Sequence, residues 1–277
     1  MYMNTRSRTK PSNDENEVLA DDNSLEIMPI RPLAIKENKQ YHPHLPSINR
    51  NAGSITLLIG ATSAGKTTTL VNMLMGKNFW GGKESAFEKV YLFSPSVLVD
   101  DSIRHLKEVC EWKTDFKDEY LQEILARQLM FDKKDMPKIM IVVDDAVGLI
   151  HRNSALNKFL SRYRHYNANV IMSVQHFRSI SPIGRANATN VLLFNGIVNS
   201  NEMDKIQEEW GGIYKETLEK MYYRFANKKY QFLHLMLRKN PAEMFLNFQK
   251  KLDWEKYVSK KIKAKMAGED EEIIKSI

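Results

Sequence analysis

The sequence predicts an α/β fold in which helices flank a mostly parallel β-sheet. Short runs rich in β-branched residues alternate with longer amphipathic segments between residues 55 and 237, as in sheets whose strands are joined by helices. The short runs are also almost continuously apolar, which is typical of parallel strands buried on both faces. The predicted strands lie within Ser54–Gly60, Lys89–Pro95, Lys138–Asp145, Asn169–Gln175, Asn190–Gly196 and Tyr230–Leu237.

Longer segments between these runs have the apolar spacing of surface helices. Residues 118–130 (DEYLQEILARQLM) and 154–166 (SALNKFLSRYRHY) place apolar residues at positions i, i+3 and i+4. Residues 1–45 lack such periodicity and predict a polar, flexible N-terminal tail. We expect one domain over residues 46–240, followed by a charged helical tail over residues 241–277.

Composition limits the classes of protein to consider. The chain has 277 residues, of which 43% are hydrophobic, so it can bury a sizeable core. Its single cysteine, Cys110, excludes an internal disulfide framework and favours a reducing compartment. Because no apolar run approaches the ~18 residues that span a bilayer, and the polar start lacks a hydrophobic signal segment, we expect neither a membrane span nor secretion. The formal net charge of +7 fits either a polyanionic partner or an ordinary solvated surface.

The first motif with a chemical meaning is the phosphate-binding pattern G-x-x-x-x-G-K-T, the Walker A motif. Its glycines let the backbone curl so that N–H groups face a phosphate, and the following helix directs its positive end to the same place. Lys66 is expected to reach the β- and γ-phosphates, and Thr67 to place its hydroxyl on Mg²⁺. A glycine-rich surface turn does not require Lys-Thr-Thr at a strand–helix junction. The predicted ATP contacts are Gly60, Ala61, Thr62, Ser63, Ala64, Gly65, Lys66, Thr67 and Thr68.

A pair of acids follows the apolar residues 139–143. Asp144 and Asp145 are expected at the carboxyl end of a buried strand, where ligands bind in open α/β sheets. Because successive strand residues point to opposite faces, the two carboxylates can have different roles. We expect Asp144 to bind Mg²⁺ in the Walker B role and Asp145 to act as general base on the attacking water. The alternative is that the two acids cap the next helix.

The order of the predicted strands narrows the class of phosphate-binding domain. One strand lies between the loop and the acidic strand, and the strand after the acids ends in Gln175. An amide at that position can hydrogen-bond the γ-phosphate or the attacking water. This order predicts a P-loop NTPase with a RecA-like, additional-strand core, as in motor ATPases, rather than a nucleoside kinase. Alternatively, Gln175 is a polar strand end in contact with solvent.

Residues 164–195 resemble part of the FtsK/HerA superfamily. In that superfamily an arginine precedes a strand that ends in Gln, and a proline-containing loop, an Ala-Asn pair and another strand follow. Arg-His-Tyr-Asn at 164–167, Ser-Val-Gln-His at 173–176 and Arg-Ala-Asn at 185–187 look like the genome-packaging ATPases of large DNA viruses, poxvirus-like viruses and virophages. The resemblance extends over residues 50–210.

The resemblance implies a ring-forming motor that uses ATP to drive double-stranded DNA into a preformed capsid. The implied partners are double-stranded DNA, further copies of the chain and a capsid vertex or portal-like component. The implied location is the host-cell cytoplasm or viral factory, with association with the virion also open. Two other functions stay open: a helicase or chromosome-partition motor on the same core, and a nucleotide-gated DNA-binding or scaffold protein with negligible turnover.

The resemblance also implies an arginine that completes the site from a neighbouring subunit. Arg164 matches the arginine before the sensor strand, and Arg185 lies in the Arg-Ala-Asn segment. Either can stabilise charge on the transferred phosphoryl group, whereas the alternative for each is an ordinary exposed arginine. Basic clusters later in the chain fit contacts with DNA phosphates that carry no sequence information, although most are expected to be solvated. They are Lys228-Lys229, Arg238-Lys239, Lys250-Lys251, Lys260-Lys261, Lys263 and Lys265.

Overall fold

The computed structural model describes residues 44–49, 53–76, 79–81, 85–145, 154–197, 199–212, 215–239 and 242–257. All of them belong to one compact unit, Glu37–Ile277. Of the predicted N-terminal tail, residues 1–43 lie outside the described ranges. Within these ranges, no helix is long and apolar enough to span a membrane.

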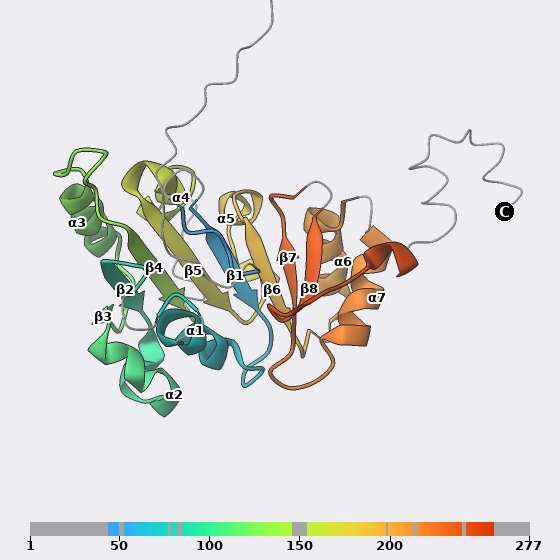
Figure 1. Cartoon of the computed structure of the whole chain (residues 1–277). Coiled ribbons are helices and arrows are strands. Elements are labelled where there is room, and N and C mark those ends of the chain that lie inside the picture. Colours follow the sequence, from blue (N-terminus) through green and yellow to red (C-terminus); the bar gives the residue numbers. More distant parts are fainter. Residues whose placement is uncertain are drawn as a thin grey trace, which may run out of the picture. The chain divides into compact units, whose positions relative to one another are not determined.

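A mixed, mostly parallel sheet forms the centre of this unit, with strand order β3-β2-β4-β5-β1-β6-β7-β8-β9 (Figure 1). The parallel strands are β1 (Ile55–Ile59), β2 (Lys89–Phe93), β3 (Glu111–Lys113), β4 (Ile139–Asp144), β5 (Ala168–Val174) and β6 (Asn190–Phe194). The antiparallel strands are β7 (Phe232–Met236), β8 (Glu243–Leu246) and β9 (Lys250–Lys251). β5 lies between β1 and β4. This is the additional strand that the sequence predicted.

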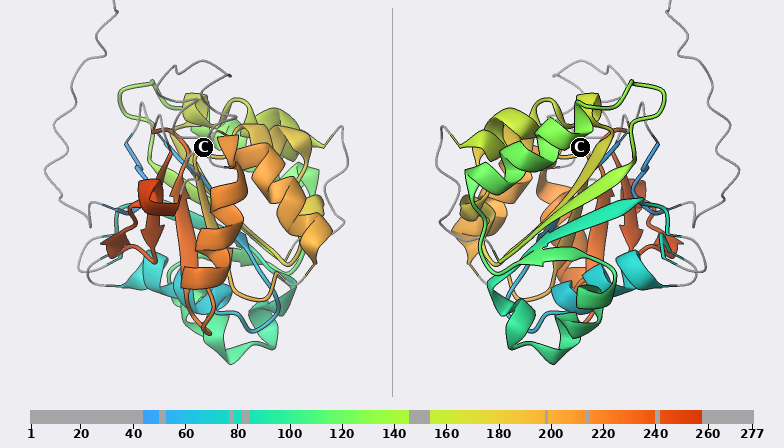
Figure 2. Two further views of the ribbon diagram at one scale, coloured as in Figure 1. Left: turned by 90° about the vertical axis from the view of Figure 1, so that its right-hand side faces the viewer. Right: turned by 90° about the vertical axis from the view of Figure 1, so that its left-hand side faces the viewer.

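Helices cover both faces of the sheet, as the two side views in Figure 2 show. On one face, the core contains side chains from α1 (Lys66–Met75) and α2 (Asp101–Arg104). The core on the other face is covered by α3 (Asp118–Gln128), α4 (Ala155–Leu160), α5 (Pro182–Ala186), α6 (Ser200–Trp210) and α7 (Lys215–Phe225). The 3-10 turns are η2 (Pro95–Leu98), η3 (His105–Glu108), η4 (Tyr163–Tyr166), η5 (Phe177–Ser179) and η7 (Trp254–Tyr257).

The continuous apolar character of the central strands follows from burial on both faces. In β1, Ile55, Leu57 and Ile59 pack into the core beneath α3–α7, whereas Leu58 packs into the core beneath α1 and α2. All five residues of this strand are buried. A strand that meets helices on both sides therefore has no solvent face that would call for alternating polar residues. The α/β fold and the mostly parallel sheet predicted from this pattern are confirmed.

Two details of the predicted elements are wrong. The predicted helix at residues 154–166 is split into α4 and η4. The predicted helical tail starting at residue 241 instead begins with β8 and β9, which continue the sheet from β7, so the sheet extends past the predicted boundary at residue 240. Met244 and Phe245 of β8 are buried, and burying them against the sheet outweighs the helical preference of the charged residues nearby. Residues 258–277 of the predicted tail lie outside the described ranges.

A neutral histidine is buried in the antiparallel part of the sheet. His234 of β7 is fully buried, and its Nε2 lies 3.0 Å from Asn190 Oδ1. Because the Asn190 amide already donates to Thr189 Oγ1, its oxygen is the acceptor and His234 Nε2 is the donor. Burial lowers the pKa of His234 to about 3, and the charge of His44 adds to this effect. Folding therefore requires His234 to remain uncharged.

We predict that His234 makes the fold sensitive to acid. Its pKa is about 3 in the folded chain but about 6.5 in an unfolded one, so the unfolded state gains a proton first as the pH falls below 6.5. The free energy of unfolding should lose about 2 kcal/mol from this residue between pH 7 and pH 5. His234→Gln should lack that loss, whereas His→Gln at the exposed His105 should keep it. Urea unfolding at the two pH values measures the difference, and parallel profiles for wild type and His234→Gln would contradict the prediction.

Candidate nucleotide-binding site

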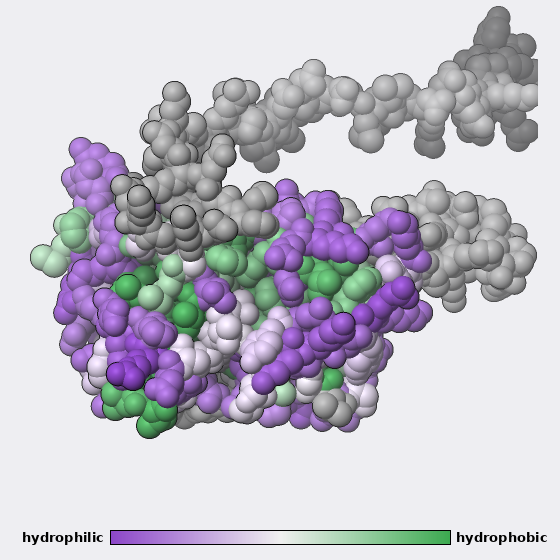
Figure 3. All heavy atoms as spheres, turned by 60° about the horizontal axis from the view of Figure 1, so that its bottom comes forward, coloured by the Kyte–Doolittle hydropathy of each residue, from purple (hydrophilic) through white to green (hydrophobic). Residues whose placement is uncertain are grey.

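A cavity of about 360 Å³ opens at the edge of the sheet where the parallel strands end. Figure 3 brings this edge, the lower one in Figure 1, toward the reader, and hydrophilic residues cover most of the coloured surface there. Many of the predicted site residues line the cavity: Thr62, Ser63, Gly65, Lys66, Thr67, Thr68, Asp144, Asp145 and Gln175. The fold thus brings three motifs that are far apart in the sequence to one place.

The loop between β1 and α1 has the curled backbone expected of a phosphate cradle. Gly65, which precedes the first residue of α1, has φ of 110°, a conformation that side chains disfavour. Gly60 is needed for a different reason, because a Cβ there would lie 2.6 Å from Phe194 Cβ. The two motif glycines therefore serve a left-handed turn and a close approach to β6, respectively.

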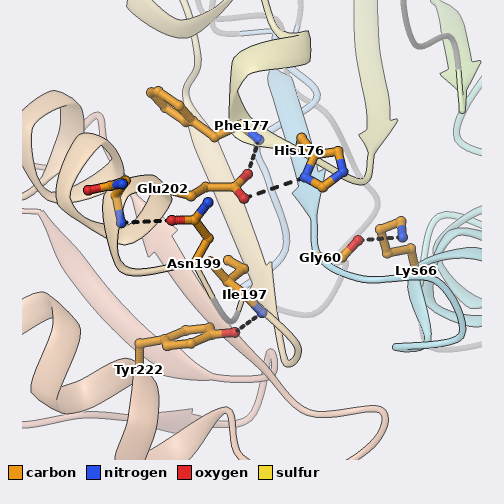
Figure 4. Close-up of polar contacts among 9 residues, drawn as sticks. Gly60, Lys66, His176, Phe177, Ile197, Asn199, Glu202 and Tyr222 are labelled. Carbon is orange, nitrogen blue, oxygen red and sulfur yellow. Dashed lines mark hydrogen bonds and ion pairs between the residues drawn. The ribbon is translucent and has the colours of Figure 1, made fainter.

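Lys66 folds back over this loop. Its Nζ donates a hydrogen bond to the carbonyl oxygen of Gly60 at 2.7 Å (Figure 4), and a second one to that of Ala61 at 2.9 Å. Burial lowers the pKa of the Lys66 ammonium, and the charges of Asp144 and Asp145 act in the opposite direction. The ammonium is thus partly desolvated and held by neutral carbonyl groups, an arrangement in which a phosphate oxygen is a stronger acceptor.

The two acids end β4 in different environments. Asp144 is buried, and its Oδ2 accepts a hydrogen bond of 3.0 Å from Ser94 Oγ. Burial raises the pKa of Asp144, while hydrogen bonds from Ser173 and Ser94 and the charge of Lys66 lower it. Asp145 is only partly buried and adopts a left-handed φ of 48°. Asp145 thus lies just beyond the strand, so the two carboxylates differ in their surroundings because of this turn rather than because strand residues alternate between faces.

Gln175 joins the second acid at the end of β5. Its Nε2 donates to Asp145 Oδ1 at 3.2 Å, and the Asp145 amide donates to the Ser173 carbonyl at 3.0 Å. Gln175 is thus oriented by a carboxylate within the cavity, which distinguishes it from a polar strand end that meets only solvent. Because the Gln175 side-chain amide and the Asp145 carboxylate lie side by side in the cavity, both can contact the same ligand or water molecule.

Neither predicted arginine lines this cavity. Arg164 lies in η4, before the amino end of β5, whereas the phosphate loop follows the carboxyl end of the parallel neighbour β1. Arg185 lies in α5, where its guanidinium stacks 4.5 Å from the Phe177 ring and its Nε is 3.8 Å from Glu209 Oε2. The fold therefore separates both arginines from the nucleotide pocket of their own chain.

Other cavity-lining residues were missed by the sequence analysis: Ser96, Asp100, Ser102, Ser173, Lys229 and Tyr230. Ser173 could have been found from its place in the strand that ends in Gln175, and Ser96 from its place just after a predicted strand. Lys229 was expected to belong to a DNA-binding or solvated cluster. It lies beside the phosphate loop because β7, which is antiparallel to β6, begins at this edge of the sheet, and Lys229 lies just before that strand.

Helices α6 and α7 hold the loops around the cavity (Figure 4). Glu202 Oε1 accepts a hydrogen bond of 2.5 Å from the Phe177 amide, and Glu202 Oε2 lies 3.5 Å from His176 Nδ1. Tyr222 Oη donates to the Phe194 carbonyl at 2.8 Å and accepts from the Ile197 amide at 3.0 Å. These two side chains fix the turns that follow β5 and β6, respectively.

A family model described as "Poxvirus A32 protein" matches residues 50–221. The chain belongs to this family. The resemblance to the packaging ATPases of poxvirus-like viruses, which the residues after β4 had indicated, is therefore confirmed. A search of curated proteins finds no match.

Solved structures similar to this A32-family chain include viral packaging enzymes. The DNA-packaging ATPase B204 from Sulfolobus Turreted Icosahedral Virus is 15% identical, with a TM-score of 0.50 over 69% of this chain and 96% of that one. The genome packaging NTPase B204 from Sulfolobus turreted icosahedral virus 2, in complex with ATP-gammaS, is 18% identical, with a TM-score of 0.49 over 71% of this chain and 97% of that one. At these identities the likeness concerns the fold, and it agrees with the predicted P-loop NTPase fold.

We predict that Glu202 stabilises the turn after Gln175 in this A32-family protein. Glu202→Ala removes the acceptor of the Phe177 amide, and Phe177 is buried, so the free energy of unfolding should fall by about 1–3 kcal/mol. Asp204→Ala, on the exposed side of the same helix, should change it by less than about 0.5 kcal/mol. Chemical denaturation of the three proteins measures this, and equal stability of the two variants would contradict the role given to Glu202.

Proposed function

We propose that this A32-family protein is an Mg²⁺-dependent ATPase that works as a homo-oligomeric ring and drives double-stranded DNA into a preformed capsid. The observation that carries the proposal is the convergence of Lys66, Asp144, Asp145 and Gln175 on one cavity at the end of the parallel strands. Two findings support the packaging function: the chain belongs to the A32 family, and the B204 protein with a similar fold is described as a DNA-packaging ATPase.

The residues at the cavity fit Mg²⁺ bound together with ATP. The Thr67 hydroxyl and the Asp144 carboxylate both line the cavity, and they are hard oxygen ligands of the kind that Mg²⁺ prefers. Asp144 is buried at a cost that raises its pKa, and a divalent cation beside it would offset that cost. When bound, Mg²⁺ neutralises charge on the β- and γ-phosphates.

The chain's own residues divide the remaining work in the proposed reaction. Lys66 exchanges the carbonyl oxygens of Gly60 and Ala61 for phosphate oxygens and stabilises their charge. Asp145, held by Gln175, accepts a proton from the attacking water, and the Gln175 amide orients that water or the γ-phosphate. These roles use groups that already lie together in the cavity, so that little rearrangement precedes the reaction.

An arginine from a neighbouring subunit completes the proposed site. Arg164 and Arg185 lie away from their own cavity, so either one can act on nucleotide only across a subunit interface. Arg164 is exposed and its Nε donates to Tyr163 Oη at 3.1 Å, whereas Arg185 is held against Phe177 and Glu209. The exposed position makes Arg164 the better of the two candidates.

The basic clusters contribute unequally to the proposed DNA contacts. Lys229 lines the nucleotide cavity, and Arg238 Nη2 donates to Tyr163 Oη at 2.7 Å. Lys250 and Lys251 are exposed on β9, where Lys251 is paired with Glu243 at 2.6 Å. Lys260, Lys261, Lys263 and Lys265 lie outside the described residues. We assign the DNA phosphate contacts to the clusters near the end of the chain, namely Lys250-Lys251, Lys260-Lys261, Lys263 and Lys265. A capsid vertex or portal-like component is the other proposed partner.

We predict that the purified protein hydrolyses ATP with Mg²⁺, that duplex DNA stimulates turnover in a salt-sensitive way, and that ATP-driven movement displaces the third strand of a DNA triplex.

Asp145→Asn should keep the wild-type affinity for Mg-ATP but turn over about 100-fold more slowly, because it loses the group that accepts the proton. Steady-state ATPase, nucleotide binding and triplex displacement measure these outcomes.

The alternatives give different results in the same assays. Separation of a forked duplex with ATP would favour a helicase. ATP binding without turnover, with or without DNA, would favour a nucleotide-gated scaffold protein. An equal loss of Mg-ATP affinity and turnover in Asp145→Asn would instead assign this residue to the metal.

We predict that activity is shared between subunits. Turnover per subunit should rise with protein concentration, because an arginine supplied by the neighbour is worth roughly 1,000-fold in rate. Lys66→Ala should be inactive alone, and so should the variant of whichever arginine acts across the interface, Arg164→Ala or Arg185→Ala. A mixture of that arginine variant with Lys66→Ala should regain activity, since the Lys66→Ala subunit lends its arginine to a neighbour with an intact phosphate loop. Concentration-independent turnover with no recovery in either mixture would rule out a shared site.

A further inference from the structure

The turn between α7 and β7 closes over the phosphate loop. The Tyr230 amide donates to the Ala64 carbonyl at 3.1 Å, and the Gln231 amide closes the turn on the Lys228 carbonyl at 3.1 Å. A Cβ on Gly65 would lie 2.6 Å from Tyr230 Cδ1, so the ring rests against the loop where the loop has no side chain. Two segments separated by more than 150 residues thus form one wall of the cavity.

Tyr230 keeps an unfavourable backbone conformation in this turn. Its φ is 65°, and the left-handed region costs a bulky residue roughly 1–2 kcal/mol. The residue remains 53% exposed, so burial in the core does not offset the strain. The ring lines the cavity, and Lys229 Nζ lies 5.0 Å from its centre. The turn therefore places an aromatic ring, with a positive charge over it, at the wall of the cavity.

The strand order decides which end of a nucleotide meets this face. Asp144, Asp145 and Gln175 follow β4 and β5, on one side of the phosphate loop that follows β1. Tyr230 precedes β7, on the other side of that loop, beyond β6. A triphosphate whose terminal phosphate faces the acids and Gln175 must leave the loop toward β6 and β7. Its nucleoside end then lies next to Tyr230.

We propose that Tyr230 stacks on the nucleobase of the bound nucleoside triphosphate, so that the site favours a nucleotide with any base over a polyphosphate that has none. This inference rests on the proposed nucleotide-binding function. An aromatic ring stacks on the π-face of a base. Because every base has such a face, stacking alone discriminates little between bases. The site should accordingly accept GTP nearly as well as ATP, and it should prefer either one to tripolyphosphate, which has no base.

The test compares two variants at position 230 with a matched control. Tyr230→Asn removes the ring but keeps a residue that tolerates the left-handed conformation, and Tyr230→Phe keeps the ring. Tyr223→Asn, at a tyrosine of α7 that is 48% exposed, is the control. Calorimetric titration of the full chain with ATP, GTP and tripolyphosphate should show about tenfold weaker binding of both nucleotides to Tyr230→Asn. Tripolyphosphate affinity should be unchanged in every variant, as should nucleotide affinity in Tyr230→Phe and Tyr223→Asn.

A measurement on the unmodified protein covers the case in which Tyr230→Asn does not fold. Photolysis of bound 8-azido-ATP should label the tryptic peptide Tyr230–Arg238, and excess ATP should prevent the labelling. Label confined to the tryptic peptide Val90–Arg104, which contains Ser96, Asp100 and Ser102 of the cavity, would overturn the inference.

Two failures can be told apart. If the wild-type protein binds neither ATP nor tripolyphosphate, the proposed function itself fails. If ATP binds and Tyr230→Asn folds with unchanged ATP affinity, only the role of Tyr230 is refuted. An equal loss of ATP and tripolyphosphate affinity in Tyr230→Asn would also refute stacking, because it would show that the turn supports the phosphate loop instead.

Discussion

The carboxyl end of β5 is the constraint on which the site depends. The Val174 carbonyl accepts a hydrogen bond of 3.3 Å from the Gly60 amide, and the adjacent Ser173 carbonyl accepts one of 3.0 Å from the Asp145 amide. Two consecutive carbonyl groups of one buried strand thus anchor the start of the phosphate loop on one side and the acid pair on the other. The strand itself then continues into Gln175. A change in its register by one residue would separate all three motifs.

The electrostatics of the cavity follow from this packing. Burial acts on Lys66 and Asp144 in opposite directions, lowering the pKa of the ammonium and raising that of the carboxyl group, and each partly restores the charged form of the other. Ser94 adds a hydrogen bond to the carboxylate, and backbone carbonyls satisfy the ammonium. The site therefore holds opposite charges at reduced solvation, where a charged ligand interacts more strongly than it would in open water.

The helices on the far side of the sheet hold the loops of the site in place. Glu202 and Tyr222 bond to backbone groups just after β5 and β6, and Gly196, in the second of these turns, approaches the phosphate loop so closely that a Cβ would lie 2.6 Å from Ala61 Cβ. A small shift of α6 or α7 would thus be felt at the loop, because Glu202 and Tyr222 bond directly to backbone groups of these turns and Gly196 leaves no space beside Ala61. The turn before β7 adds a further wall with Lys229 and Tyr230, since β7 begins at the same edge.

The local sequence was sufficient for β1, β2 and β4 to β7, for the phosphate loop and for the pair of acids, but not for the short, exposed β3. The apolar runs, the paired glycines around Lys66 and the adjacent Asp144 and Asp145 each express a requirement that operates within a few residues: burial on both faces, a left-handed turn, or a polar strand end. Such local requirements can be recognised from the types and spacing of neighbouring residues. The order of β1, β5 and β4 in space was predictable only through the class of protein that the pattern indicated.

Tertiary structure alone decided the rest. β8 and β9 consist of short segments with many charged residues, and they are strands because Met244 and Phe245 are buried against β7. Tyr230 and Lys229 belong to the site because they precede β7, which begins beside the end of β6 and so places them against the phosphate loop, more than 150 residues away in the chain. Arg164 and Arg185 were recognisable as arginines near a sensor strand, but only the direction of β5 and the position of α5 excluded them from their own cavity. Contacts between distant segments depend on strand order and direction, which no local pattern of residues encodes.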